Sequence, residues 1–178
     1  GTVDFGALST AAITALSSTQ IKALTTGLVV AISAAQLAGL RADQVGTLST
    51  AQVRALSTAH YSLLSTTQLG AMTTSQIAAF EGQDLQVLGS AQFAALGTKG
   101  FAALSTANLS YLSNDAVSVI TTGQLSGLST ARLNALGTSQ FGALSGAQVS
   151  ALTTAQVASL GTVDFGALST AAITALSS

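Results

Sequence analysis

The sequence predicts an all-α fold: a solenoid of very short capped helices, with one helix in each eight-residue repeat. Three observations predict it: the eight-residue period is unbroken, a helix-capping pattern recurs at fixed positions of the repeat, and the two apolar positions of the repeat match that pattern. We call the repeat an octad, and residues 1–178 form a single continuous octad array. A β-solenoid with two octads per coil is the alternative fold.

The period is defined by two apolar positions. Every residue whose number is a multiple of eight, from Leu8 to Leu176, is large and apolar, and every residue at the position that runs from Phe5 to Ile173 is apolar or aromatic. The consensus is Leu-Ser/Thr-Thr-Ala-Gln-Val-x-Ala, as in residues 48–55. A longer period lies above the octad, because residues 161–178 repeat residues 1–18 identically. The simplest interpretation is a 160-residue block followed by the start of the next; an artificial duplication of the ends is the alternative.

The capping pattern explains both apolar positions. With Ser49 as N-cap, Gln52 is the third helical residue, N3, and the two complete a capping box. Leu48 and Val53 then form the hydrophobic staple that accompanies such a box. Ser or Thr occupies the cap position in 16 of 22 octads and Gln occupies N3 in 11 of 22, so the device recurs along the chain. Each octad is therefore predicted to form about one and a half helical turns.

Helices this short are unstable alone, so successive octads must stack on a shared apolar spine. A straight helix would drift by roughly 80° per octad, and a straight strand would put the two apolar positions on opposite faces. The chain must therefore bend in every octad. The β-solenoid stays open because Ser, Thr and Val favour strands, but Ala and Gln do not, and no turn residue recurs at a fixed position.

Composition excludes several functions. Only 6% of the residues are charged, against about 25% in ordinary soluble proteins, and the net charge is -1. Five scattered basic residues cannot follow a row of phosphates, so we expect no nucleic-acid binding. Mean hydropathy is +0.59, but hydroxyl and amide side chains interrupt every window long enough to span a bilayer, so we expect no membrane span. A weakly charged Ser/Thr/Gln/Ala surface favours self-association, both end to end and side by side.

No residue cluster indicates a catalytic, cofactor or metal site, so we expect no enzyme. His60, the only histidine, has hydroxyls nearby but no acid, and it is interpreted as a solvent-facing substitute for Gln at N3. The segment Gly97-Thr98-Lys99-Gly100 lacks the spacing of a phosphate loop. The acids also lack the spacing of a calcium loop, and an Asp at N3 suits the helix dipole. They are Asp4, Asp43, Glu81, Asp84, Asp115 and Asp164.

Thr recurs at the second octad position, the first residue of each predicted helix. Aligned Thr rows are typical of ice-binding surfaces, but Thr also suits a position beside a cap, and we favour that explanation because other residues interrupt the row. The Thr positions include Thr2, Thr10, Thr26, Thr50, Thr58, Thr66, Thr74, Thr98 and Thr106. The interruptions are Ala34, Ala42, Gly82, Asn114 and Gly146.

The repeated Leu-Ser/Thr-Thr-Ala-Gln-Val/Ile/Leu-x-Ala unit resembles the Ala/Thr/Gln-rich octapeptide tracts of very large bacterial secreted or surface fibre proteins, often described as adhesin-like. This resemblance implies a structural, self-assembling protein that is extracellular or at the cell surface: part of a filament, sheath or adhesin stalk. Its partners would be copies of itself and other surface or matrix polymers. The alternatives are a Thr-face binding protein for ice or a crystalline polysaccharide, and a functional amyloid if the octads form strands.

Overall fold

The computed structural model describes residues 6–176, and within this range the chain is all-α, with one short helix in nearly every octad and no strand. The all-α solenoid is therefore confirmed, and the β-solenoid alternative is wrong for the described residues. Asp4 and Thr2, named above, lie outside them. The helices are α2 (Thr10–Thr14), α3 (Ser18–Ala23), α4 (Thr26–Ala31), α5 (Ala34–Ala38), α6 (Ala42–Gly46), α7 (Thr50–Arg54), α8 (Thr58–Leu63), α9 (Thr66–Gly70), α10 (Thr74–Ile77), α11 (Gly82–Gln86), α12 (Ser90–Ala95), α13 (Gly97–Ala103), α14 (Thr106–Ser110), α15 (Asn114–Ser118), α16 (Thr122–Ser126), α17 (Thr130–Leu133), α18 (Thr138–Gly142), α19 (Gly146–Ser150), α20 (Thr154–Ser159), α21 (Thr162–Ala167) and α22 (Thr170–Ala175).

The predicted capping box forms as expected. Ser49 is extended, with φ -71° and ψ 160°, and its Oγ accepts a hydrogen bond from the Gln52 amide nitrogen at 3.1 Å. The Ser49 backbone N–H donates in return to Oε1 of Gln52 at 2.7 Å. An extended residue at the start of each octad breaks the preceding helix and starts the next, so the chain bends once per octad.

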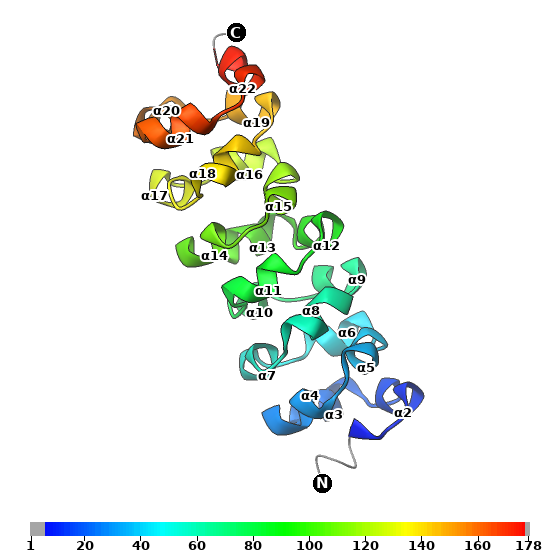
Figure 1. The fold of residues 1–178 in the computed structure, drawn as a ribbon. Coiled ribbons are helices and arrows are strands. Elements are labelled where there is room, and N and C mark those ends of the chain that lie inside the picture. Colours follow the sequence, from blue (N-terminus) through cyan, green and yellow to red (C-terminus); the bar gives the residue numbers. More distant parts are fainter. Residues whose placement is uncertain (1–5, 177–178) are drawn as a thin grey trace.

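Three octads make one turn of the solenoid. Each helix packs against the third helix after it, from the pair α2 and α5 to the pair α19 and α22. The helices therefore form three rows along an elongated stack, with α2 near one end and α22 at the other (Figure 1). The first row is α2, α5, α8, α11, α14, α17 and α20; the second row is α3, α6, α9, α12, α15, α18 and α21; the third row is α4, α7, α10, α13, α16, α19 and α22.

The core is the predicted spine of the two apolar octad positions. Val53 is fully buried and Leu48 nearly so, and most octads repeat this pair in one continuous cluster. Small residues let successive turns approach closely. A Cβ on Gly46 would lie 2.9 Å from the carbonyl oxygen of Ala71, one turn further on. A larger side chain there would push the two turns apart.

The bend between α12 and α13, which we call the irregular corner, lacks the extended residue that separates other successive helices. Leu96 is helical, with φ -62° and ψ -23°, and Gly97 has a φ of 63°. The Leu96 carbonyl accepts from the Gly100 amide and so belongs to α13 itself. This octad has Gly at both the cap and N3, so neither half of a side-chain capping box can form.

Candidate functional site

The N3 side chain links each turn of the solenoid to the turn before it. Gln52 is 2% exposed, and its Oε1 is occupied by the capping box. Its Nε2 donates to the carbonyl oxygens of Ile21 at 3.0 Å and Leu24 at 2.7 Å, at the end of α3. One side-chain amide thus caps its own helix, supplies a donor to the Leu24 carbonyl and adds a second donor to the Ile21 carbonyl, which also accepts from the Leu24 N–H at 3.2 Å.

The same contact recurs along the described chain, and we call it the inter-turn ladder. In each case the N3 side chain donates to, or in His60 contacts, the carbonyl oxygen 28 residues earlier. The ladder residues are Gln36, Gln44, Gln52, His60, Gln68, Gln76, Gln92, Asn108, Arg132, Gln140, Gln148 and Gln156. Because every turn repeats it, the ladder is a property of the whole solenoid rather than a local site.

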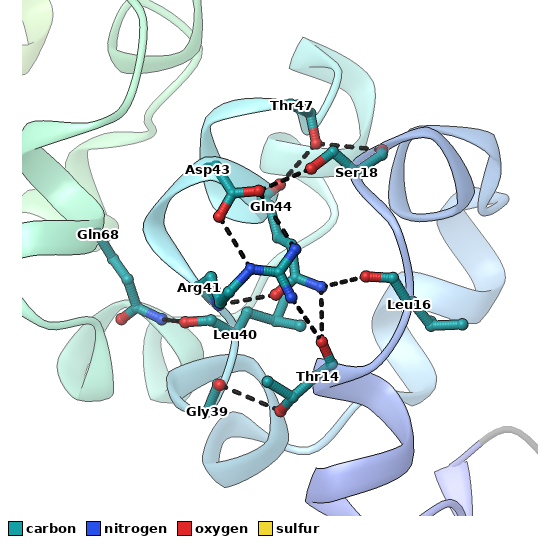
Figure 2. Close-up of polar contacts among 10 residues, drawn as sticks. All are labelled: Thr14, Leu16, Ser18, Gly39, Leu40, Arg41, Asp43, Gln44, Thr47 and Gln68. Carbon is teal, nitrogen blue, oxygen red and sulfur yellow. Dashed lines mark hydrogen bonds and ion pairs between the residues drawn. The ribbon is translucent and has the colours of Figure 1, made fainter.

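Figure 2 shows the Gln44 contact of the ladder, the Gln68 contact with Leu40, and the polar contacts beside Gln44. The Gln44 amide reaches the carbonyl oxygens of Thr14, at 3.1 Å, and Leu16. Arg41 donates to the same Thr14 oxygen at 2.9 Å, and its Nε lies 3.1 Å from Oδ1 of Asp43. The Arg41 guanidinium, together with the Ser18 hydroxyl across the turn, lowers the pKa of Asp43. The acid Asp43 therefore takes part in an exposed contact between turns.

The interpretation of His60 as solvent-facing is wrong. The ring is 6% exposed; Nδ1 accepts from the Ser57 amide at 2.9 Å, and Nε2 lies 2.7 Å from the Ile32 carbonyl oxygen. These two partners require a neutral ring with its proton on Nε2. His60 therefore reproduces both functions of glutamine, acceptor within its own octad and donor to the turn before.

Arg132 separates the two functions of the N3 residue. Its guanidinium donates to the carbonyl oxygens of Phe101 and Leu104, at 3.1 and 2.9 Å, in the positions that a glutamine amide would use. It has no acceptor, so it cannot return the capping hydrogen bond to Ser129. Its Nε is buried without a partner among the described residues. Arginine in place of glutamine at N3 therefore keeps the hydrogen bonds to the preceding turn and loses the side-chain half of the capping box.

Asp84, also at N3, keeps the capping contact within its own octad but not the contact with the preceding turn. Its Oδ2 accepts from the Glu81 amide at 2.8 Å, but a carboxylate has no proton to donate to the preceding turn. Burial raises the pKa of Asp84, and the nearby Glu81 carboxylate raises it further, although the Glu81 N–H acts in the opposite direction. The buried hydroxyl of Tyr61 donates at 2.9 Å to the Val53 carbonyl, which is the oxygen that an N3 amide at position 84 would reach. Tyr61 thus supplies one of the donors that Asp84 lacks.

The ladder is interrupted at the irregular corner. Gly100 has no side chain to reach back, and a cavity of about 440 Å³ lies beside it, lined in part by Met72, Ile77 and Lys99. One turn later, Gln124 keeps its capping contact to Thr121, but its amide nitrogen donates to no described residue. The Leu96 carbonyl that it would reach is already used inside α13. The Gly97-to-Gly100 segment is thus a break in the ladder and has no phosphate-loop spacing.

The remaining acidic side chains do not come together to form a site. Asp115 lies on the exposed side of α15 and Asp164 accepts from Thr138 one turn earlier. Within residues 6–176, no group of three or more His, Cys, Asp or Glu side chains could hold a metal ion. In the same range, no helix is both long enough and apolar enough to cross a bilayer.

The Thr positions lie on three rows rather than one. The third row carries an uninterrupted series of exposed threonines over five successive turns: Thr26, Thr50, Thr74, Thr98 and Thr122. Of the interruptions named above, only Gly146 falls in this row, in the next turn. The other four fall in the first and second rows.

Repeated short helices, a continuous spine and contacts only between neighbouring turns define a helical solenoid repeat protein. The chain belongs to the ALTTAQ repeat family, whose model matches residues 1–33, 48–82, 77–114 and 117–154. The six residues of that description occur as residues 151–156, which run from the end of one octad through the cap to the N3 residue Gln156. Neither a curated protein nor a solved structure matches the chain.

Proposed function

We propose that this protein is structural and self-assembling, and that it forms part of an extracellular filament, sheath or adhesin stalk. The observation that carries the proposal is the recurrence of the ladder along the described chain. A solenoid whose stability comes from contacts between neighbouring turns can be extended without a new kind of interface. A uniform lattice also gives no convergent set of polar groups of the kind that catalysis needs, and we therefore propose no enzymatic activity.

Lateral association is supported by an exposed apolar stripe on the first row. Leu63, Val87 and Tyr111 are separated by one turn each and lie at the ends of α8, α11 and α14. Each is between 37 and 52% exposed. A Cβ on Gly82 would lie 2.3 Å from the Tyr111 ring, so the ring covers that glycine. With little charge to keep copies apart, such a stripe favours side-by-side contact.

Electron microscopy of the purified chain tests the proposal. We expect filaments that bundle, and we expect Leu63→Lys with Tyr111→Lys to leave single filaments but remove the bundles. Val30→Lys is the matched control, because Val30 is 56% exposed but lies on α4, outside the stripe. Discrete particles at all concentrations would contradict the structural function. Immunogold labelling of intact producing cells tests the location, and label confined to the cell interior would contradict it.

The uninterrupted Thr row on the third row supports a second candidate, binding of ice or a crystalline polysaccharide. Thermal hysteresis and cellulose or chitin pull-down test it. Thr50→Lys should abolish either activity, whereas Thr66→Lys, at the equivalent exposed position of the second row, should not. Absence of both activities in the unmodified chain would eliminate this candidate. The amyloid alternative required strands, and because residues 6–176 form none we do not propose it.

A further inference from the structure

The inter-turn ladder is not evenly distributed along the chain. It is unbroken over six N3 residues from Gln36 to Gln76, and again over four from Arg132 to Gln156. In the segment between these runs, only two of the six N3 residues donate to the turn before. Beyond the second run, Asp164 and Ala172 also donate to no residue that the structure describes. Only the central segment, α11–α16, has an unbroken run on each side, and its N3 residues without the contact are Asp84, Gly100, Ala116 and Gln124.

The four missing contacts have three causes. The Asp84 carboxylate has no proton to donate when it is ionised, and Gly100 and Ala116 have no polar side chain. Gln124 has the donor, but the Leu96 carbonyl that it would reach already accepts from the Gly100 amide at 3.2 Å. The irregular corner therefore removes two contacts from the ladder, that of Gly100 and that of Gln124.

Both of these contacts are missing from the third row, where α13 and α16 follow one another. The first row keeps a contact within the segment, because Asn108 donates to the Phe80 carbonyl at 2.9 Å. The second row also keeps one, because Gln92 donates to the Leu64 carbonyl at 2.7 Å. The cavity of about 440 Å³ lies on the third row, since its lining includes residues of both α10 and α13. Successive turns of this segment are therefore held together least on the third row.

The backbone of the irregular corner is also less restrained than that of a regular corner. At Ser49 the two hydrogen bonds of the capping box fix the extended residue. Gly97 has no side chain for such a box, and its φ is 63°, a conformation that glycine adopts without steric cost. The apolar spine nevertheless continues through the corner: Phe93 and Phe101 are buried on either side of it, with their ring centroids 6.2 Å apart. The segment is thus folded, but its turns are weakly tied.

We propose that α11–α16 form a hinge in the solenoid, which opens on the third row and lets the two regular parts of the chain bend relative to each other. The stability of a solenoid is approximately a sum of contacts between neighbouring repeats, so bending concentrates where those contacts are fewest. The buried spine keeps the turns of the hinge folded while their edges on the third row separate. This inference goes beyond the proposed function, because the hinge belongs to a single chain and exists whether or not copies of the chain associate.

Distances between pairs of spin labels test the hinge, because the chain has no cysteine of its own. The test pair is Thr74→Cys/Thr122→Cys, two exposed positions on the third row with α13 between them. The matched pair is Thr26→Cys/Thr74→Cys, which has the same row, octad position and separation in sequence but spans α7 in the unbroken run. A third pair, Thr66→Cys/Asn114→Cys, spans the same two turns as the test pair on the second row. Circular dichroism checks that each variant folds, and electron paramagnetic resonance measures the distances.

We expect the Thr74/Thr122 pair to give a broader distribution, shifted to longer distances, than either of the other two pairs. Equal distributions for the Thr74/Thr122 and Thr26/Thr74 pairs would overturn the hinge. An equal shift in the second-row pair would overturn its opening on the third row.

Restoring the capping pattern at the irregular corner tests the cause of the bending. Gly97→Ser/Gly100→Gln gives this octad the consensus residues at the cap and at N3. The new glutamine should reach the Met72 carbonyl, and the extended corner should free an acceptor for Gln124. A Cβ on Gly100 would lie 2.7 Å from Cδ1 of Ile77, the end of a flexible side chain, so that side chain has to move. We expect this variant to narrow the distribution of the third-row test pair to the width of the matched pair, and an unchanged width in the folded variant would overturn the proposal.

The reverse variant, Gln52→Ala/Gln76→Ala, removes the two ladder contacts that the Thr26/Thr74 pair spans. It keeps both regular corners at their serine and threonine caps, so it tests the ladder without a glycine at the corner. We expect the Thr26/Thr74 distribution to broaden toward that of the Thr74/Thr122 pair. This second variant decides the matter even where the restored corner does not fold: a Thr26/Thr74 distribution that stays narrow would show that ladder contacts do not set the stiffness of the solenoid.

Discussion

The side-chain amide of Gln52 donates to the main-chain carbonyl oxygen of Leu24, 28 residues earlier, at 2.7 Å. This one contact explains why a chain of helices too short to be stable alone forms a long solenoid. The Ser49 N–H donates to Oε1 of the same side-chain amide, and this capping hydrogen bond orients the amide nitrogen of Gln52 toward the preceding turn. In octads such as this one, local helix initiation and contact between turns thus depend on a single residue.

Gln52→Glu should separate these two contributions. Glutamate keeps the acceptor for the capping box, but at neutral pH it removes the side-chain donor to the carbonyls of Ile21 and Leu24 and brings a carboxylate against them. We expect a loss of about 2–3 kcal/mol in the free energy of unfolding, measured by urea denaturation. Gln20→Glu is the matched control, because Gln20 makes the same box but is exposed, and its amide nitrogen donates to no residue within 6–176. Equal losses in both variants would contradict the ladder.

Asp84→Asn should stabilise the protein at neutral pH. Asn108, at the same octad position, donates from Nδ2 to the Phe80 carbonyl at 2.9 Å, and an asparagine at 84 could make the equivalent contact with Leu56. The change also removes a buried carboxylate, so we expect a gain of about 1–2 kcal/mol in thermal or urea unfolding. Asp115→Asn, on the exposed side of α15, should change stability little.

The gain from Asp84→Asn should depend on pH. The pKa of Asp84 is raised in the folded chain, so the native state binds more protons than the unfolded state between the usual carboxyl pKa and the raised one. Stability therefore falls as pH rises through that window and stays reduced above it. The advantage of the asparagine should be full at pH 7 and smaller below about pH 3, where both states are protonated. An advantage that grows on acidification would contradict this.

Gly46→Ala should destabilise the solenoid although alanine is the better helix former. The added Cβ would lie 2.9 Å from the carbonyl oxygen of Ala71, so the two turns must separate. We expect a loss of about 1–3 kcal/mol by urea unfolding. Gly123→Ala, inside α16 with nothing within 4 Å of the new Cβ, should instead raise stability by about 0.5–1 kcal/mol. Stabilisation by both changes would show that turns do not meet closely at Gly46.

The local structure of each octad could be predicted from the sequence, because the capping box is a contact among residues three apart. Ser49, Gln52, Leu48 and Val53 take the positions that their pattern indicates. The number of octads per turn could not be predicted, because it depends on how helices pack and no residue type marks it. The second function of glutamine was missed because capping already accounted for that residue. The arginine at N3, Arg132, was the one sequence signal for the contact between turns, because its side chain can donate hydrogen bonds but cannot accept the one that completes a capping box.

The irregular corner at Leu96 likewise shows that effects between turns could not be predicted from the sequence alone. Gly at cap positions is compatible with an extended corner, as at Gly89 and Gly137, where Gln at N3 still accepts from the glycine amide. Only where Gly also replaces the N3 residue, at Gly97 and Gly100, does the corner change. The sequence contains that pair of substitutions, but the consequence for Gln124, one turn later, depends on the three-octad turn.

A pair of double-cysteine variants tests the three-octad turn most directly. Gly6→Cys/Ala31→Cys joins positions separated by a full turn and one further residue, and its Cβ atoms would lie 3.9 Å apart. Gly6→Cys/Ala23→Cys joins the same two octad positions with one octad fewer between them. Both pairs share Gly6→Cys, so its effect on packing is common to them. With three octads per turn, the first pair should close rapidly to an intrachain disulfide and the second should not. Closure of the Ala23 pair with an open Ala31 pair would mean two octads per turn and would contradict the ladder.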